Sequence, residues 1–184
     1  MSILKVARMG HPVLRAKARP LEKSEIRRPE IQKLIDDMFD TMAEYHGVGL
    51  AAPQIHERVR IFVAALGRGD SGDSGVNHEP GDHEPIAIIN PEIVTVGSDV
   101  VEDWEGCLSI PDIRGKVPRA LEIEVRAYDR RGRKISLHAK GFTARVIQHE
   151  TDHLDGVLFF DRMTSFNTLT FLDEYSRFWA KDEE

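Results

Sequence analysis

The chain has 184 residues, of which 41% are hydrophobic and 30% are charged, and its formal net charge is -6 at pH 7. A chain of this length suits a single domain over residues 1–184 that buries roughly 70% of its unfolded surface. The negative charge argues against direct binding of bare nucleic acid, and no apolar run approaches the ~20 residues of a membrane span, so neither partner is expected.

The N-terminal part of the chain is expected to form an irregular arm followed by one core helix. Residues 1–28 fit neither a helical nor a strand period, whereas Pro29 suits the first position of a helix and Gly47 its end. The apolar residues between them recur every three or four positions and are expected to form the buried face: Ile31, Leu34, Ile35, Met38, Met42 and Tyr45.

The next segment, Gly47-Val48-Gly49-Leu50-Ala51-Ala52-Pro53-Gln54, consists mainly of small residues and ends in an amide. Its two glycines permit close approaches that a side chain would block. One interpretation is a tight connection to a strand at 59–66. The other is a loop whose backbone lies against a ligand, with Gln54 donating a hydrogen bond to it. These residues alone leave both interpretations open, but the lack of a Gly-Lys-Ser/Thr ending excludes a phosphate loop.

Residues 67–85 are rich in glycine and acidic side chains and are predicted to form a flexible acidic insertion loop. Such a composition cannot bury apolar surface. His78 and His83 lie within this loop, and we expect them to be solvated rather than to bind a metal.

The second half of the chain is expected to supply most of the sheet. Apolar or alternating segments predict strands at 86–90, 92–96, 100–104, 121–127 and 135–139. Residues 129–132 have the composition of a hairpin turn, and a short apolar strand is expected at 157–160.

Two helices are expected toward the C-terminal end. One spans 142–154, and Phe142, Val146 and Ile147 are expected to anchor it in the core. The other is amphipathic, with a predicted buried stripe of Phe166, Leu169, Leu172, Tyr175, Phe178 and Trp179.

The helix at 142–154 contains an H-E-x-x-H motif. Side chains four residues apart lie on one face of a helix, so His149 and His153 can bind a single metal ion. Glu150 can then act as general base on a water at that ion, which is the layout of a hydrolytic metal site. The competing interpretation is a solvated helix face that carries two histidines. The predicted fold class is α+β: a mixed, mainly antiparallel sheet around a central metal-bearing helix, with an N-terminal helix and a C-terminal helix.

A catalytic site of this kind normally has three protein ligands and leaves a position for water. Metzincins would carry a third histidine where this chain has Phe159, and Glu174, near the gluzincin spacing, falls on the polar face of the last helix. The remaining candidate is Cys107, within Glu105-Gly106-Cys107-Leu108-Ser109, although a free cysteine is most often a small buried hydrophobe. A Cys-His-His set would suit Zn²⁺ or Fe²⁺.

Three segments occur in order along the chain: Gly47-Val48-Gly49-Leu50-Ala51-Ala52-Pro53-Gln54, Glu105-Gly106-Cys107-Leu108-Ser109 and Gln148-His149-Glu150-Thr151-Asp152-His153. Together they resemble the three signature motifs of the peptide deformylase family, and the similarity runs over nearly the whole chain. The resemblance implies a metal-dependent hydrolase that removes the N-formyl group from the initiator methionine of nascent polypeptides and releases formate. The acidic, glycine-rich insertion at 67–85 is longer than is usual in the compact bacterial forms of the family, and it leaves the three motifs intact.

The resemblance also implies which residues form the site. Cys107, His149 and His153 would hold the metal, natively Fe²⁺ (iron), with Zn²⁺ (zinc), Ni²⁺ or Co²⁺ able to substitute. Glu150 would be the general acid and base, and the Gln54 side chain with the Leu108 backbone N–H would bind the oxyanion.

On the substrate side, the resemblance places Val48 and Gly49 along the backbone of an N-formylmethionyl peptide that adds to the sheet as a strand. The methionine side chain would lie near Val48, Val146 and His149. Arg114 aligns with a basic residue near the downstream end of the peptide, or else it is plain surface charge. Glu105 is grouped with these residues, but we expect it to orient the loop that carries Cys107 rather than to do chemistry.

Cys107 is the only cysteine, which excludes an intramolecular disulfide and fits a reducing compartment, most simply the cytoplasm. No secretory signal is visible at residues 1–6, and earlier removal of an organelle-targeting peptide is left open by the sequence. The resemblance implies transient association with the ribosome.

Two other function classes remain as alternatives. A zincin-type metalloendopeptidase would need a third ligand other than Cys107. A non-catalytic metal- or peptide-binding module would need neither Glu150 nor Gln54, and both are present.

Overall fold

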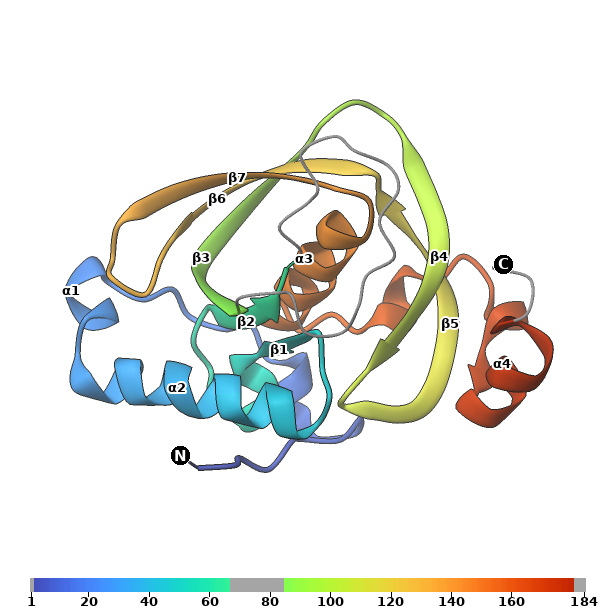
Figure 1. The fold of residues 1–184 in the computed structure, drawn as a ribbon, viewed down its shortest axis with the longest axis horizontal. Coiled ribbons are helices and arrows are strands. Elements are labelled where there is room, and N and C mark those ends of the chain that lie inside the picture. Colours follow the sequence, from blue (N-terminus) through green and yellow to red (C-terminus); the bar gives the residue numbers. More distant parts are fainter. Residues whose placement is uncertain (1, 67–84, 181–184) are drawn as a thin grey trace.

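Helix α3 (Gly141–Leu154), which carries the H-E-x-x-H motif, lies centrally among the strands of two antiparallel sheets (Figure 1). The structure is a computed structural model that describes residues 2–66 and 85–180. The predicted α+β class, with mainly antiparallel strands around this helix, is confirmed. The insertion loop predicted at 67–85, with His78 and His83, lies outside the described residues apart from Pro85.

Within the described ranges the larger sheet has five strands in the order β1-β2-β3-β6-β7, and all neighbours are antiparallel. The bounds are Gly49–Ala51 for β1, Ile61–Ala65 for β2, Pro85–Thr95 for β3, Glu122–Tyr128 for β6 and Lys134–Lys140 for β7. The two strands predicted at 86–90 and 92–96 are a single strand, β3. Its register shifts between Ile89 and Glu92, where Pro91 has no N–H to contribute to the ladder.

The smaller sheet pairs β4 (Val100–Cys107), β5 (Ile110–Ala120) and β8 (Thr170–Phe171) in that order. The regular pairing of β4 with β5 ends between Gly106 and Cys107, so Cys107 sits at the irregular tip of a hairpin. The sequence did not predict β5, because its Pro111, Gly115 and Pro118 disfavour a strand locally.

The N-terminal helix is confirmed as α2 (Pro29–Glu44), which buries Ile35, Met38 and Met42. The expected burial of Tyr45 is wrong, since this side chain is 42% exposed just past the helix end. The arm before α2 is not wholly irregular: it contains the 3-10 turn η1 (Pro12–Arg15) and the short helix α1 (Lys23–Ile26). A second 3-10 turn, η2 (Ala52–Ile55), follows β1.

The C-terminal region departs from the prediction. Helix α4 (Leu172–Phe178) has seven residues, and none is buried against the described part of the chain. Phe166 and Phe178 of the predicted stripe are 66% and 61% exposed. The strand predicted at 157–160 is wrong, because the 3-10 turn η3 (Phe159–Arg162) begins there, and η4 (Phe166–Thr168) follows before β8. An amphipathic pattern identifies an apolar stripe but not a surface that covers it.

Two clusters of buried hydrophobic residues hold α3 and the Cys107 end of β4 in place. One packs Val146, Ile147 and Leu154 of α3 with side chains of the larger sheet, and the other surrounds Cys107 and includes Phe159. The prediction that Phe142 anchors the helix is wrong, since Phe142 is 57% exposed.

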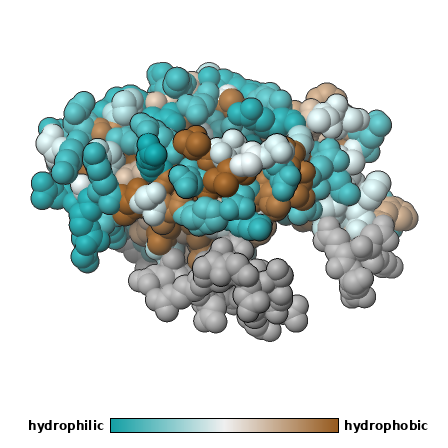
Figure 2. Space-filling view, turned by 90° about the horizontal axis from the view of Figure 1, so that it is seen from above, coloured by the Kyte–Doolittle hydropathy of each residue, from teal (hydrophilic) through white to brown (hydrophobic). Residues whose placement is uncertain are grey.

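Figure 2 shows the molecule from above, turned by 90° from the view of Figure 1. This face is largely hydrophilic, and hydrophobic side chains gather toward its middle. Among the described helices, none is both long and apolar enough to cross a membrane.

Candidate metal centre

The two histidines of the H-E-x-x-H motif face the interior from successive turns of α3. The ring centroids of His149 and His153 are 4.9 Å apart, and the residues are 8% and 1% exposed. Val146, one turn before His149, is buried on the same side of the helix. The solvated-face interpretation of this motif is therefore wrong.

Cys107 meets the histidines from the tip of the β4–β5 hairpin. Its Sγ lies 3.2 Å from Nε2 of His153. One ligand atom from each of Cys107, His149 and His153 lies within 4.8 Å of the others, and all three residues are buried. The structure thus brings together the three residues that the sequence nominated as metal ligands.

The donor set fits a divalent transition metal. One thiolate and two imidazoles are ligands that Zn²⁺ and Fe²⁺ accept. Nδ1 of His149 lies 2.8 Å from Oε2 of Glu105, which leaves the other ring nitrogen to face a metal. The rival ligand Glu174 instead lies on α4 and pairs with Arg177.

The charges around the site also favour a cation. Burial opposes a charge on His149, but hydrogen bonds to Cys107 and Glu105 raise the pKa of His149 well above its ordinary value. Burial, together with the charge on His149, lowers the pKa of His153 well below its ordinary value and keeps that imidazole neutral, as a ligand must be. A divalent ion would supply the positive charge that these groups stabilise.

Glu150 lies beside the histidines and is 4% exposed. Burial raises the pKa of Glu150 to about 7. Its Oε2 has no hydrogen-bond partner within residues 2–66 and 85–180. A carboxyl group with a pKa near neutrality can both accept a proton and return it.

Gln54 is 1% exposed and its amide is held at both ends. Its Oε1 accepts a hydrogen bond from the Ala51 N–H at 2.8 Å, and its Nε2 lies 3.2 Å from Oγ of Ser109 and 3.5 Å from Sγ of Cys107. These contacts orient the amide nitrogen toward the thiol. Leu108, the other predicted oxyanion donor, directly follows Cys107 in the chain.

Glu105 occupies a buried position behind His149. Its two carboxylate oxygens accept hydrogen bonds from Arg119 at 2.8 and 3.0 Å, and Oε2 also faces His149. Burial opposes ionisation, but the bonds from His149 and Arg119 hold the pKa of Glu105 at about 2. Glu105 is only 6% exposed, so it is placed to orient His149. This position does not suit direct contact with a substrate, which its grouping with the substrate-side residues would imply.

Two further residues of this network were not recognised in the sequence. Arg145 donates to Oε1 of Glu105 at 2.9 Å, and Asp152 pairs with both Arg119 and Arg162. Charged residues on a helix are usually solvated, so only their spacing from His149 on α3 could have singled them out.

The residues predicted to contact a peptide are less uniformly buried. Val48 is 41% exposed, and Gly49 begins the edge strand β1. Val146 is 8% exposed on α3. Arg114 lies across Gly106, since a Cβ built on that glycine would be 2.9 Å from Nε of Arg114.

A family model described as polypeptide deformylase matches residues 3–168 of this chain. The chain belongs to that family. Peptide deformylases are metal-dependent hydrolases that remove the N-formyl group from nascent polypeptides, and membership assigns this activity to the chain. The alternatives of a zincin-type endopeptidase and a non-catalytic binding module are therefore set aside.

Individual relatives cover nearly the full length of the chain. Peptide deformylase 2 of Nostoc sp. is 44% identical over 181 residues, which are 98% of this chain and 97% of that protein. The peptide deformylase of Halothermothrix orenii is 43% identical over 164 residues, 89% of this chain and 95% of that protein.

Solved structures agree with these matches. The peptide deformylase from Thermotoga maritima has a TM-score of 0.77 and 37% identity, and the match covers 90% of this chain and 100% of that one. A deformylase from Acinetobacter baumannii with Met-Ala-Ser bound has a TM-score of 0.78 and 34% identity, over 88% of this chain and 99% of that one.

Proposed function

We propose that Cys107, His149 and His153 hold a catalytic Fe²⁺ ion and that Glu150 is the general acid and base of the deformylase reaction. The proposal is supported chiefly by the 3.2 Å approach of the Cys107 thiol to Nε2 of His153, in a buried site where one ligand atom from each of the three residues lies within 4.8 Å of the others. Zn²⁺, Ni²⁺ and Co²⁺ would suit the same donors. The bound ion would supply the Lewis acidity that polarises the formyl oxygen and activates a water molecule.

Proton transfer falls to Glu150. Its raised pKa, about 7, lets the carboxylate accept a proton from water near neutral pH. The same group then returns the proton to the leaving amine nitrogen, which becomes the free N-terminus. Its buried position keeps other water from competing for that proton.

Gln54 and Leu108 are proposed to bind the negative charge that develops on the formyl oxygen. The Gln54 amide is already fixed by Ala51 and Ser109, so donating to the oxyanion requires no reorientation. The Leu108 N–H adjoins the same thiol. Loss of one such donor typically costs ~10²–10³ in rate.

The proposed substrate is an N-formylmethionyl peptide. The edge strand β1 pairs with β2 on one side only within the described sheet, which leaves the Val48–Gly49 backbone able to accept an added strand. The methionine side chain would lie near Val48 and Val146, and Arg114 would lie near the downstream end of the peptide. The deformylase of Acinetobacter baumannii with Met-Ala-Ser bound supports a peptide in this kind of site. Glu105 is assigned to positioning His149 instead.

We also propose that residues 1–184 form one catalytic domain that works in the cytoplasm in transient association with the ribosome, where formylated chains emerge. The single, unpaired Cys107 is consistent with a reducing compartment.

Formate release from a formyl-Met tripeptide tests the proposal, using protein loaded anaerobically with Fe²⁺. Glu150→Ala should abolish turnover and keep the metal, whereas Cys107→Ser should lose or weaken metal binding. Glu174→Ala is the matched control, because this acid lies on α4, where its side chain is 43% exposed and pairs with Arg177, and its loss should affect neither property. A metal-loaded wild type that releases no formate, or a Cys107→Ser variant with unchanged metal affinity, would contradict the assignment.

A further inference from the structure

Arg145 is a buried arginine on the helix that presents the two histidines. It lies one turn before His149 and is 6% exposed. A buried guanidinium is costly unless its donors are used, and those of Arg145 reach four acceptors. They are Oε1 of Glu105 at 2.9 Å and the backbone oxygens of Val101 at 2.7 Å, Val117 at 2.7 Å and Asp103 at 3.3 Å.

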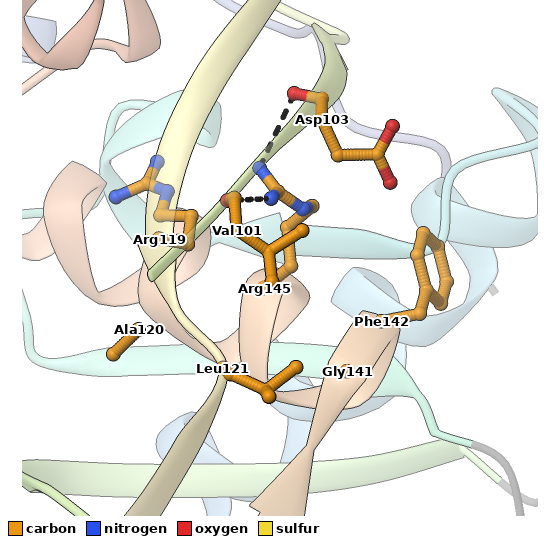
Figure 3. A pocket seen from close by; sticks show the side chains of 8 residues that line it. All are labelled: Val101, Asp103, Arg119, Ala120, Leu121, Gly141, Phe142 and Arg145. Atoms are coloured by element: carbon orange, nitrogen blue, oxygen red, sulfur yellow. Dashed lines mark hydrogen bonds between the residues drawn. The ribbon is translucent and has the colours of Figure 1, made fainter. Parts of the chain in front are cut away.

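These acceptors lie on the hairpin that carries Cys107. Val101 and Asp103 belong to β4, which ends at Cys107, and Val117 belongs to β5. Figure 3 shows the Arg145 side chain reaching toward Val101 and Asp103, with its bonds to their backbone carbonyls drawn as dashed lines. One side chain therefore joins the helix that carries both histidines to the hairpin that carries the thiol.

Arg145 also reaches a histidine through Glu105. Oε1 of Glu105 accepts bonds from Arg145 and Arg119, and Oε2 accepts from Arg119 and faces Nδ1 of His149. With two contacts at each oxygen, the carboxylate has little freedom to rotate. A partner on Nδ1 fixes the tautomer and orientation of a metal-binding imidazole.

We propose that Arg145 is a positioning residue of the metal centre: it holds Glu105 against His149 and fixes the distance between α3 and the tip of β4. The inference rests on the proposed function, because it takes Cys107, His149 and His153 as the ligands. Arg119 cannot replace it, since Arg119 extends from β5 toward Asp152 and has no bond to the β4 carbonyls among the described contacts.

A small cavity beside Arg145 indicates what its removal would do. The cavity has a volume of about 90 Å³, and Arg145, Arg119 and Phe142 are among the residues that line it (Figure 3). A space of this size admits water. Without the Arg145 guanidinium, water would reach Glu105 and compete with His149 for its carboxylate.

The test measures Zn²⁺ affinity of the full chain by competition with a chromophoric chelator. Arg145→Met should bind Zn²⁺ about 10–100-fold more weakly, the usual effect of losing a partner behind a metal ligand. The thiolate-to-metal absorption of the Co²⁺-loaded variant should shift, while KM for a formyl-Met tripeptide should stay close to the wild-type value because Arg145 lies behind the ligands.

The matched control is Arg60→Met. Arg60 also bonds α3 from outside the helix, through the Leu154 carbonyl at 3.5 Å and the Asp155 carboxylate at 2.6 Å, but it does not touch Glu105. Its loss should lower Tm and leave Zn²⁺ affinity and the Co²⁺ spectrum unchanged. An equal loss of affinity in both variants would mean that Arg145 only stabilises the fold, and would overturn the inference.

A double-mutant cycle separates action through Glu105 from independent effects. If Arg145 acts through Glu105, adding Arg145→Met to Glu105→Gln should weaken Zn²⁺ binding by much less than it does in the wild type. Additive losses would overturn the part of the inference that runs through Glu105, and Arg145→Met with wild-type affinity would overturn all of it. Should Arg145→Met fail to fold, Arg145→Lys serves instead, because an ammonium cannot reach Glu105 and the β4 carbonyls together. An Arg145→Lys variant that binds Zn²⁺ with wild-type affinity would likewise overturn the inference.

The outcome for wild-type protein distinguishes this inference from the proposed function. Wild-type protein that binds no Zn²⁺ and releases no formate would contradict the ligand assignment itself. Wild-type protein that binds and turns over normally, beside an unaffected Arg145→Met variant, would contradict the role of Arg145 alone.

Discussion

Gly49 of β1 leaves the space that the Glu150 carboxylate of α3 occupies. A Cβ built on Gly49 would lie 2.7 Å from Cδ of Glu150, closer than real Cβ contacts approach. Gly49 is therefore required for a close approach between a strand and a helix that are 101 residues apart, counted as 150 minus 49. This is a second reason for glycine beside the proposed contact with the peptide backbone.

Gly49→Ala should therefore impair catalysis while sparing the metal. The added methyl group would push Glu150 off its place, and a misplacement of about 1 Å can cost on the order of 10²-fold in rate. The kcat for formate release and the iron content should be measured on the same preparation. Loss of iron in parallel with activity would show that the ligands, rather than Glu150, had moved, and unchanged kcat would show that Glu150 tolerates the methyl group.

The sequence predicts the parts of the site that local periodicity controls. His149 and His153 are four residues apart, so any helix places them on one face, and α3 does so. Cys107 and His149 are 42 residues apart in the chain, counted as 149 minus 107. No local sequence pattern could therefore predict that this helix and Cys107 come into contact. The sequence alone offers Cys107 only as a remaining candidate, and the family resemblance, not the spacing, identifies it as the third ligand.

The missed features depend on contacts between distant segments. The strand β5 contains prolines and a glycine and exists because it pairs with β4 and β8. The bonds of Arg145 to Glu105 and to the β4 carbonyls span 40 or more residues. In contrast, the apolar stripe around α4 is evident in the sequence but remains largely exposed, because burial also requires a complementary surface.

Gln54→Ala should reduce both turnover and stability. Loss of the Nε2 donor should lower kcat by ~10²–10³. Loss of Oε1 leaves the buried Ala51 N–H without its partner, which should lower the free energy of unfolding by about 1–3 kcal/mol. Steady-state kinetics and urea denaturation measure the two effects separately. A variant with normal kcat but lower stability would mean that Gln54 is structural and not an oxyanion donor.

Gly156, just after α3, should tolerate alanine poorly. Its φ is +75°, and a Cβ there would lie 2.6 Å from the Arg15 backbone oxygen. Gly97 is the matched control, because its φ is +72° but no atom of residues 2–66 or 85–180 lies within 4 Å of a built Cβ. Gly97→Ala should cost only the backbone strain, about 1 kcal/mol. Gly156→Ala should cost clearly more in the same denaturation experiment, and equal losses would show that the Arg15 segment moves aside freely.

The proposed thiolate ligand should make the iron form sensitive to oxygen. Fe²⁺ can pass electrons to oxygen and Zn²⁺ cannot, so oxidants generated at the iron would meet Cys107 before any other side chain of comparable reactivity. Prolonged exposure to air should inactivate the Fe²⁺ form and convert Cys107 to oxygenated products that mass spectrometry detects. The Zn²⁺ form of the same protein should keep its initial activity and an unmodified Cys107. Stable activity of the iron form in air, or inactivation with Cys107 intact, would show that the thiol is not the vulnerable group.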